Sequence, residues 1–108
     1  MNKPDYLYFL LESYHSPKYV MQRTEAMASA TTKDALINYI GYWRSWISEN
    51  GDWRFEDSTC RLKTWETDDN NYYIGTLDEK EYIHYHIFKA PKLKGWEDRK
   101  KVEEKVYE

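Results

Sequence analysis

Hydrophobic positions recur at spacings of three and four between residues 31 and 51, which predicts one long amphipathic helix. Thr31, followed three residues later by Asp34, forms a capping pattern, and the helix dipole favours an acidic residue in the first turn. Asn50-Gly51 is a stop signal, because glycine tolerates the left-handed conformation that closes a helix. The apolar face consists of Leu36, Tyr39, Ile40, Trp43 and Ile47.

The chain before this helix is rich in aromatic and aliphatic residues and favours a β-hairpin. Residues 5–14 predict a strand buried on both faces, and His15-Ser16-Pro17-Lys18 has the composition of a turn. We expect residues 18–28 to form the second strand. A helix is the alternative for residues 19–30, with Ser16 as its cap and Pro17 in its first turn, and the sequence leaves this choice open.

Alternation of polar and apolar positions predicts further strands after the helix. Trp53 to Phe55 is expected to enter this β region, and strands are expected over residues 58–66, 72–77 and 81–89. In the last of these, Ile83, Tyr85 and Ile87 share one face. A thin apolar stripe predicts a short C-terminal helix over residues 96–107.

The predicted element order is therefore ββαβββα. We expect one α+β domain over residues 1–108, in which a small antiparallel sheet has the long amphipathic helix packed on a face. Residues 1–4 and 90–95 are expected to be loose or linking segments.

Composition and charge narrow the classes of function. Aromatic residues make up 18% of the chain, with 11 Tyr and 5 Trp, and such side chains suit half-buried positions and interfaces. Residues 1–88 contain 9 basic and 14 acidic side chains, whereas residues 89–101 carry a net charge of +4. With one cysteine, Cys60, and no apolar stretch of about 20 residues, the chain is expected to be cytoplasmic and without a membrane span.

Candidate catalytic chemistry is sparse. His84-x-His86 could present two imidazoles to one metal, because alternate strand residues share a face, but the spacing supplies no third ligand. Cys60 lies in a predicted strand, where a structural thiol is expected, and the four glycines are too scattered to form a phosphate-binding loop. We therefore expect no metal, no cofactor and no enzymatic activity.

Two binding functions fit the aromatic content better. The first is docking onto a larger protein with a basic surface, through exposed aromatics and an acidic rim. The alternative is single-stranded nucleic-acid binding, in which bases stack on rings of a sheet face and cations meet phosphates. The protein could be a monomer or a homodimer. The residues expected to bind a protein partner are Trp46, Trp53, Asp68, Asp69, Tyr72, Tyr73 and Trp96. Those expected to bind nucleic acid are Arg61, Lys63, Trp65, Tyr82, His84, His86 and Phe88.

In its short length, its Tyr-, Asp- and Asn-rich composition, its single cysteine and its lack of a catalytic signature, the chain resembles small accessory proteins of bacteriophages and other mobile elements. The resemblance covers length and composition only and includes no motif. It implies a protein that works in the host cytoplasm by binding and inhibiting a host or defence protein.

Overall fold

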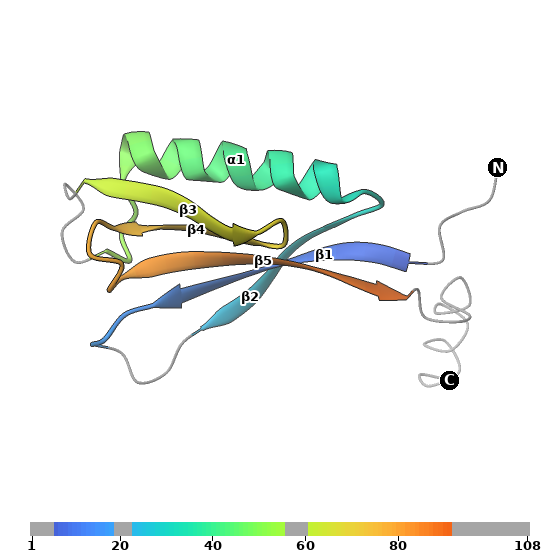
Figure 1. Ribbon diagram of the computed structural model, residues 1–108, viewed down its shortest axis with the longest axis horizontal. Helices are drawn as coiled ribbons and strands as arrows, with labels where there is room; N and C mark the ends of the chain where they lie inside the picture. Colours follow the sequence, from blue (N-terminus) through green and yellow to red (C-terminus); the bar gives the residue numbers. More distant parts are fainter. Residues whose placement is uncertain (1–5, 19–22, 56–60, 92–108) are drawn as a thin grey trace, which may run out of the picture.

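The computed structural model of the protein describes residues 6–18, 23–55 and 61–91, which form a five-stranded antiparallel sheet and one helix. The elements are β1 (Tyr6–His15), β2 (Thr24–Ala30), α1 (Lys33–Asn50), β3 (Leu62–Asp68), β4 (Asn71–Thr76) and β5 (Tyr82–Pro91). The strand order is β2-β1-β5-β4-β3, so β5 lies at the centre. Helix α1 connects the two edge strands and runs along one face of the sheet (Figure 1). The predicted α+β class, with an antiparallel sheet and a helix on one face, is confirmed.

Helix α1 begins and ends close to its sequence signals. Its cap is Thr32, not Thr31, and the Thr32 hydroxyl accepts a hydrogen bond from the Ala35 N–H at 3.3 Å. At the other end Gly51 has a φ of 78°, and its N–H donates to the Ile47 carbonyl at 2.7 Å. Leu36, Ile40 and Ile47 are buried, and Tyr39 and Trp43 pack beside them, which confirms the predicted apolar face.

The core lies between α1 and the face of the sheet that the helix covers. In β5, Ile83, Tyr85 and Ile87 all point into it, as predicted, while the intervening residues lie on the other face. Burying each such side chain contributes about 1.5–3 kcal/mol. The buried hydrophobic residues are Leu10, Leu36, Ile40, Ile47, Phe55, Tyr72, Ile74, Ile83, Tyr85 and Ile87.

Several expectations about individual segments are corrected. Trp53 to Phe55 forms a turn and not a strand, because the Phe55 N–H bonds back to the Asp52 carbonyl at 3.1 Å. Strand β1 is buried on only one face, since Leu10 is buried but its neighbour Phe9 is half-exposed. Residues 90–91 belong to β5, where Pro91 pairs with Tyr6, and so they are not a linker.

The structure describes part of residues 19–30, for which strand and helix were both possible, but not the expected C-terminal helix. Residues 24–30 are a strand, which confirms the hairpin over the described part of that stretch. Residues 19–22, Cys60 and the expected helix over residues 96–107 lie outside the described residues, so the order seen is ββαβββ. Within residues 6–18, 23–55 and 61–91, no helix is long and apolar enough to cross a membrane.

Candidate interaction surfaces

The solvent side of α1 carries a connected group of aromatic rings. Trp43 is half-buried against the core, and the rings of Tyr42 and Trp46 lie edge-on to it at centroid distances of 5.5 and 6.2 Å. Tyr39 contacts the same indole at 6.2 Å. Tyr42 and Trp46 remain 63% and 45% exposed. The helix therefore presents two large rings to solvent, supported from below by a third.

Trp53 extends into solvent from the turn that follows α1. Its side chain is 87% exposed, the largest value among the exposed large hydrophobic residues of the described chain. Phe55, two residues after Trp53, is buried in the core, and its ring packs edge-on against the Tyr14 ring with a centroid distance of 5.7 Å. Gly51, two residues before Trp53, is fixed by its bond to α1. The turn is thus anchored on both sides of an indole that itself contacts water.

A cluster of charged groups holds the same turn in place. The Asp52 carboxylate accepts bonds from the Arg54 backbone N–H at 2.9 Å and from two guanidinium nitrogens, each at 2.8 Å. A third guanidinium nitrogen bonds to the Glu12 carboxylate on β1 at 2.6 Å. The side chains of Glu12 and Asp52 are only 11% and 10% exposed. Buried charges are tolerated when paired and hydrogen-bonded in this way.

The pKa values in this cluster follow from that pairing. Burial opposes ionisation of Asp52, but hydrogen bonds from the Arg54 side chain and backbone outweigh it and hold the Asp52 pKa below its usual range. Burial likewise opposes the charge on Arg54, but the bonds to Asp52 and Glu12 outweigh it and raise the Arg54 pKa. Burial, reinforced by the Glu12 carboxylate, raises the pKa of the Tyr85 hydroxyl. Asp52 and Arg54 are therefore charged at neutral pH, the Tyr85 hydroxyl is neutral, and the bond from Arg54 to Glu12 holds the turn against β1.

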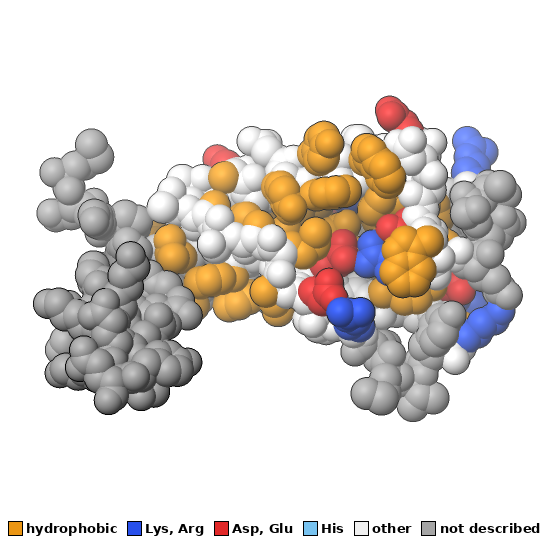
Figure 2. Space-filling model, turned by 180° about the vertical axis from the view of Figure 1, so that it is seen from behind, with side chains coloured by type: hydrophobic (Ala, Val, Ile, Leu, Met, Phe, Trp, Pro, Cys, Tyr) orange, Lys and Arg blue, Asp and Glu red, His pale blue; other side chains and the backbone are white. Residues whose placement is uncertain are grey.

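Figure 2 shows the side of the molecule that is hidden in Figure 1. Hydrophobic side chains gather across its middle, and acidic and basic side chains lie directly among them. Apolar patches bordered by charged groups are typical of interaction sites on soluble proteins.

The seven residues expected to bind a protein partner do not form one surface. Trp46 and Trp53 lie at the C-terminal end of α1. Asp68 and Asp69 lie at the opposite end, since Lys33 at the start of α1 contacts Asp69 at 3.1 Å. Trp96 lies outside the described residues.

The two adjacent tyrosines of that set, Tyr72 and Tyr73, point to opposite faces of β4. Tyr72 is buried against the helix, and its hydroxyl donates to the Asp69 carbonyl at 2.9 Å. Tyr73 lies on the face of the sheet away from α1, beside Trp65 and His84. The Asp68 carboxylate is held by the Asn70 N–H and the Asn71 amide, which lower its pKa.

The face of the sheet away from α1, which we call the open sheet face, carries most of the residues expected to bind nucleic acid. Its strand register brings together residues from five strands, because alternate positions point to the same side. Sequence reasoning missed Phe9, Leu11, Ser13 and His15, although their alternation along β1 was the available signal. Over its three central strands, this face consists of Phe9, Leu11, Ser13, His15, Asn71, Tyr73, Gly75, Tyr82, His84, His86 and Phe88, with Lys63 and Trp65 beside them on β3.

Rings on this face stack across neighbouring strands. Trp65, Tyr73 and His84 form a parallel stack with centroid distances of 5.2 and 4.6 Å and interplanar angles of 1° and 6°. His15 and Tyr82 stack at 4.7 Å. Neighbouring strands lie about 4.8 Å apart, so rings stacked face to face across them stand upright on the sheet. They present their edges outward and their faces to one another.

Asn71 joins two of the histidines. Its side-chain oxygen lies 2.7 Å from His84 Nε2 and 2.8 Å from His86 Nδ1, and its amide nitrogen donates to the Asp68 carboxylate at 2.8 Å. Because the amide nitrogen is used by Asp68, the oxygen must accept, and each histidine donates an N–H to it. Burial, then the neighbouring His86 and His15, lower the pKa of His84. In the described part of the chain, no three His, Cys, Asp or Glu side chains are placed to hold a metal ion.

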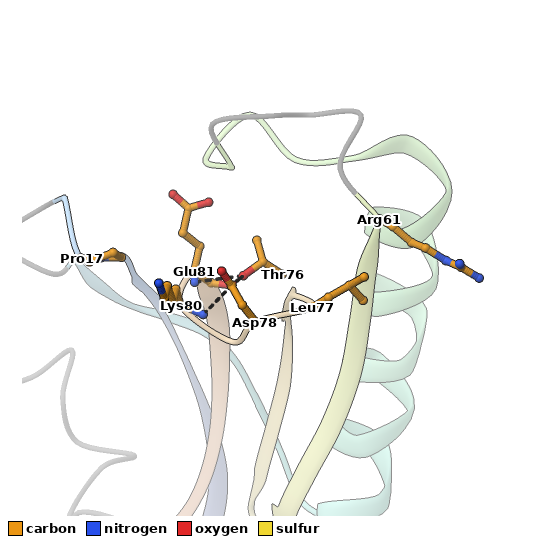
Figure 3. A pocket seen from close by; sticks show the side chains of 7 residues that line it. All are labelled: Pro17, Arg61, Thr76, Leu77, Asp78, Lys80 and Glu81. Carbon is orange, nitrogen blue, oxygen red and sulfur yellow. Dashed lines mark hydrogen bonds between the residues drawn. The ribbon is translucent and has the colours of Figure 1, made fainter.

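The cations of the nucleic-acid set lie at the margin of the open sheet face. Lys63 bonds to Glu79 at 2.8 Å and lies over the Trp65 ring, with its nitrogen 5.3 Å from the ring centroid. Arg61, just before β3, lines a pocket of about 430 Å³ at the β4–β5 turn. Figure 3 shows that the Arg61 guanidinium points away from the other side chains of this pocket.

The pocket itself has no arrangement suited to catalysis. The Asp78 carboxylate accepts from the Thr76 hydroxyl at 2.6 Å and from the Lys80 N–H at 3.1 Å, and these bonds lower its pKa (Figure 3). Glu81 accepts a longer bond, 3.4 Å, from the Ser16 hydroxyl. These polar groups serve the turn and do not converge on one point. The remaining lining residues are Pro17, Leu77 and Lys80.

No protein-family model matches the chain, and neither a curated protein nor a solved structure matches it significantly.

Proposed function

We propose that the protein is a non-enzymatic protein-binding module and that it docks through Tyr42, Trp46 and Trp53, which we call the tryptophan surface. The observation that carries this proposal is the 87% exposure of Trp53 in a turn fixed by Arg54 and Phe55. An exposed indole contributes nothing to the core. Trp and Tyr are the residues most enriched at binding hot spots. A rigid turn also lowers the entropy that binding would otherwise cost.

The charges around this surface indicate the partner's chemistry. The two basic residues of α1 are engaged, Lys33 by Asp69 and Arg44 by Glu66, whose carboxylate is 2.8 Å from the Arg44 guanidinium. The exposed Glu49 is not balanced by a basic side chain in the last turn of α1. The negative end of the helix dipole lies there too. These features favour a partner whose contact surface is apolar with basic residues.

The resemblance to phage accessory proteins adds one expectation to this proposal, namely that binding inhibits the partner. It rests on length and composition.

A photo-crosslinker tests the proposal directly. We would replace Trp53 by p-benzoylphenylalanine in the full chain, and in a matched control replace Asn38, which is exposed on the N-terminal half of α1. We expect one protein to crosslink at position 53 and not at position 38, with a yield that falls as salt is raised. Equal crosslinking at both positions would contradict the proposal.

Single-stranded nucleic-acid binding is the second candidate function. Its support is that Lys63, Trp65, Tyr82, His84, His86 and Phe88 share the open sheet face. Two features weigh against it. The upright rings offer edges and not the faces on which bases stack. Lys63 is also engaged by Glu79. Under this candidate, an oligonucleotide binds with steep salt dependence, and Trp65→Ala removes the binding while Trp53→Ala does not.

A further inference from the structure

The open sheet face is a broad surface that no described element covers. The only helix in the described residues, α1, lies on the other side, where its side chains meet Leu10, Ile74 and Ile83. On the open side the large residues, including Phe9, Leu11 and Phe88, are all half-exposed. An antiparallel sheet can have one face in water, but an extended exposed apolar patch on a protein usually marks an interaction site.

The centre of this face carries no carboxylate, lysine or arginine side chain. Across β1, β5 and β4, its residues are aromatic, aliphatic, glycine, histidine or uncharged polar, and the Asn71 side-chain oxygen accepts an N–H from His84 and from His86. At the margin, Lys63 on β3 is paired with Glu79. A partner rich in charge would lose solvation on such a surface without gaining a counter-charge. A neutral surface, by contrast, can meet its own copy without like-charge repulsion.

The shape of the face also suits a second sheet. Phe9 and Phe88 stack across β1 and β5 at 5.4 Å, and the Trp65, Tyr73 and His84 rings stack beside them, so a row of ring edges points outward. Side chains from two facing sheets interdigitate in layers about 10 Å apart, and upright rings provide ridges for that packing.

From these observations we propose that two copies of the chain associate through the open sheet face, with a twofold axis that packs sheet against sheet. A twofold contact uses the same patch on both copies, so it must be complementary to itself, as a neutral, ring-edged face is.

The size of the face sets the expected strength of this dimer. Five strands about 4.8 Å apart span about 24 Å, and the seven residues from Phe9 to His15 span about 23 Å, which gives about 550 Å² for each copy. The pair then buries about 1,100 Å², near the lower limit for specific interfaces. Interfaces at this lower limit belong to weak and transient associations, so we expect a reversible dimer that dissociates on dilution.

Three histidines make this association sensitive to pH. The His84 ring lies 6.2 Å from His15 and 5.9 Å from His86, so all three would lie inside the interface. Three other titratable side chains lie around these histidines, namely Tyr82 on β5, Tyr73 on β4 and Asp68 at the end of β3. The Lys63–Glu79 pair lies at the margin. On the described strand β1, His15 is the one titratable side chain on this face. Protonation of these imidazoles in acid would place positive charges in a closed contact, so we expect the dimer to dissociate at low pH.

Sedimentation velocity of the full chain from about 1 to 300 µM tests the proposal. At pH 7.5 we expect a concentration-dependent monomer–dimer equilibrium, and at pH 5.0 a loss of association of at least tenfold. Two variants put a charge inside the interface, Leu11→Lys and Ser13→Lys, and the matched control Leu77→Lys puts the same charge on the exposed β4–β5 turn.

Both interface variants should stay monomeric to 300 µM, while Leu77→Lys behaves as wild type. Melting curves identify any variant that fails to fold. If Leu11→Lys unfolds, Ser13→Lys still tests the interface, because it replaces a small polar residue. A wild-type chain that remains monomeric to 300 µM at pH 7.5 would overturn the proposal. So would a dimer that both folded interface variants retain, or one that Trp53→Ala abolishes. The proposal does not depend on the tryptophan surface, so either can fail alone.

Discussion

The guanidinium of Arg54 reaches across 42 residues of sequence to the carboxylate of Glu12, and the two lie 2.6 Å apart on the helix-covered side of the sheet. This bond fastens the turn after α1 to the middle of β1. Between that bond and the buried ring of Phe55, the indole of Trp53 is left in solvent. The docking proposal therefore depends on a contact between two distant parts of the chain.

Breaking this contact should cost stability. In Glu12→Ala the Arg54 guanidinium keeps Asp52 but loses its second carboxylate in a site where it is only 20% exposed. Removing one partner of such a pair leaves a charge poorly compensated, and we expect a loss of about 2–3 kcal/mol in the free energy of unfolding. Urea denaturation measures it. Glu25→Ala, which removes a solvent-exposed carboxylate on β2 opposite Glu12, is the control and should change stability by less than about 0.5 kcal/mol.

Acid should weaken the same cluster. Burial opposes ionisation of Asp52, but hydrogen bonds from Arg54 outweigh it, so the pKa of Asp52 in the folded protein lies below that of an ordinary aspartate. A depressed folded pKa contributes stability that is fully present above the unfolded pKa and is lost as the pH falls through the folded pKa. The free energy of unfolding should therefore decline below about pH 4. In Asp52→Asn this contribution should be absent, so the decline should be shallower. Equal slopes for the two proteins below pH 4 would show that Asp52 does not titrate as described.

Two glycines should respond oppositely to alanine. A Cβ on Gly75 would lie 2.4 Å from the Glu81 carbonyl oxygen and 2.5 Å from the Tyr82 Cβ. Both distances are shorter than non-bonded contacts allow, so the backbone of β4 or β5 would have to shift. Gly75→Ala should destabilise the protein by about 1–3 kcal/mol. A Cβ on Gly41 would meet no atom within 4 Å, and Gly41 lies inside α1. Gly41→Ala should stabilise by about 0.5–1 kcal/mol. Melting curves of the two variants compare them, and a stabilising Gly75→Ala would show the close approach to be wrong.

Asn71 should control the titration of the histidines. In Asn71→Asp a carboxylate would take the place of the amide oxygen that accepts from His84 Nε2 and His86 Nδ1. A negative charge favours the protonated imidazole, so we expect the pKa of His84, which burial and the neighbouring histidines lower, to rise. NMR titration of the imidazole C–H signals measures this. His15, which bonds to Ser13 instead, is the internal control and should shift less.

The sequence predicted those features that depend on local periodicity. The face of α1 and the alternation along β5 were correct because each follows from spacing within one element. Tyr72 and Tyr73 were placed together in the partner set, although adjacent strand residues point to opposite faces. The sequence predicts that Trp53 to Phe55 enter a β region, whereas the bonds of Asp52 form a turn there.

Other features depend on which strands meet. Nothing local in β1 shows that it pairs with β5, yet this pairing puts Phe9 beside Phe88 and His15 beside Tyr82. The bond between Glu12 and Arg54 likewise exists only once β1 and the end of α1 are brought together. Side-chain spacing within a segment carries no information about such contacts, so the open sheet face and the fixed turn emerged only from the fold.

We propose Trp53 as the anchor of the tryptophan surface. Its most direct test is a quantitative pull-down with the full chain from the native host lysate, with and without nuclease, in which wild type, Trp53→Ala and Trp65→Ala are compared. Trp53→Ala should change the free energy of unfolding by less than about 0.5 kcal/mol, since it alters an exposed side chain. We expect wild type to recover one near-stoichiometric protein that resists nuclease treatment. Trp65→Ala should recover the same protein, and Trp53→Ala should not. Two results would contradict the docking proposal. One is recovery of the same amount of partner by Trp53→Ala as by wild type. The other is a bound partner that is lost on nuclease treatment and in Trp65→Ala.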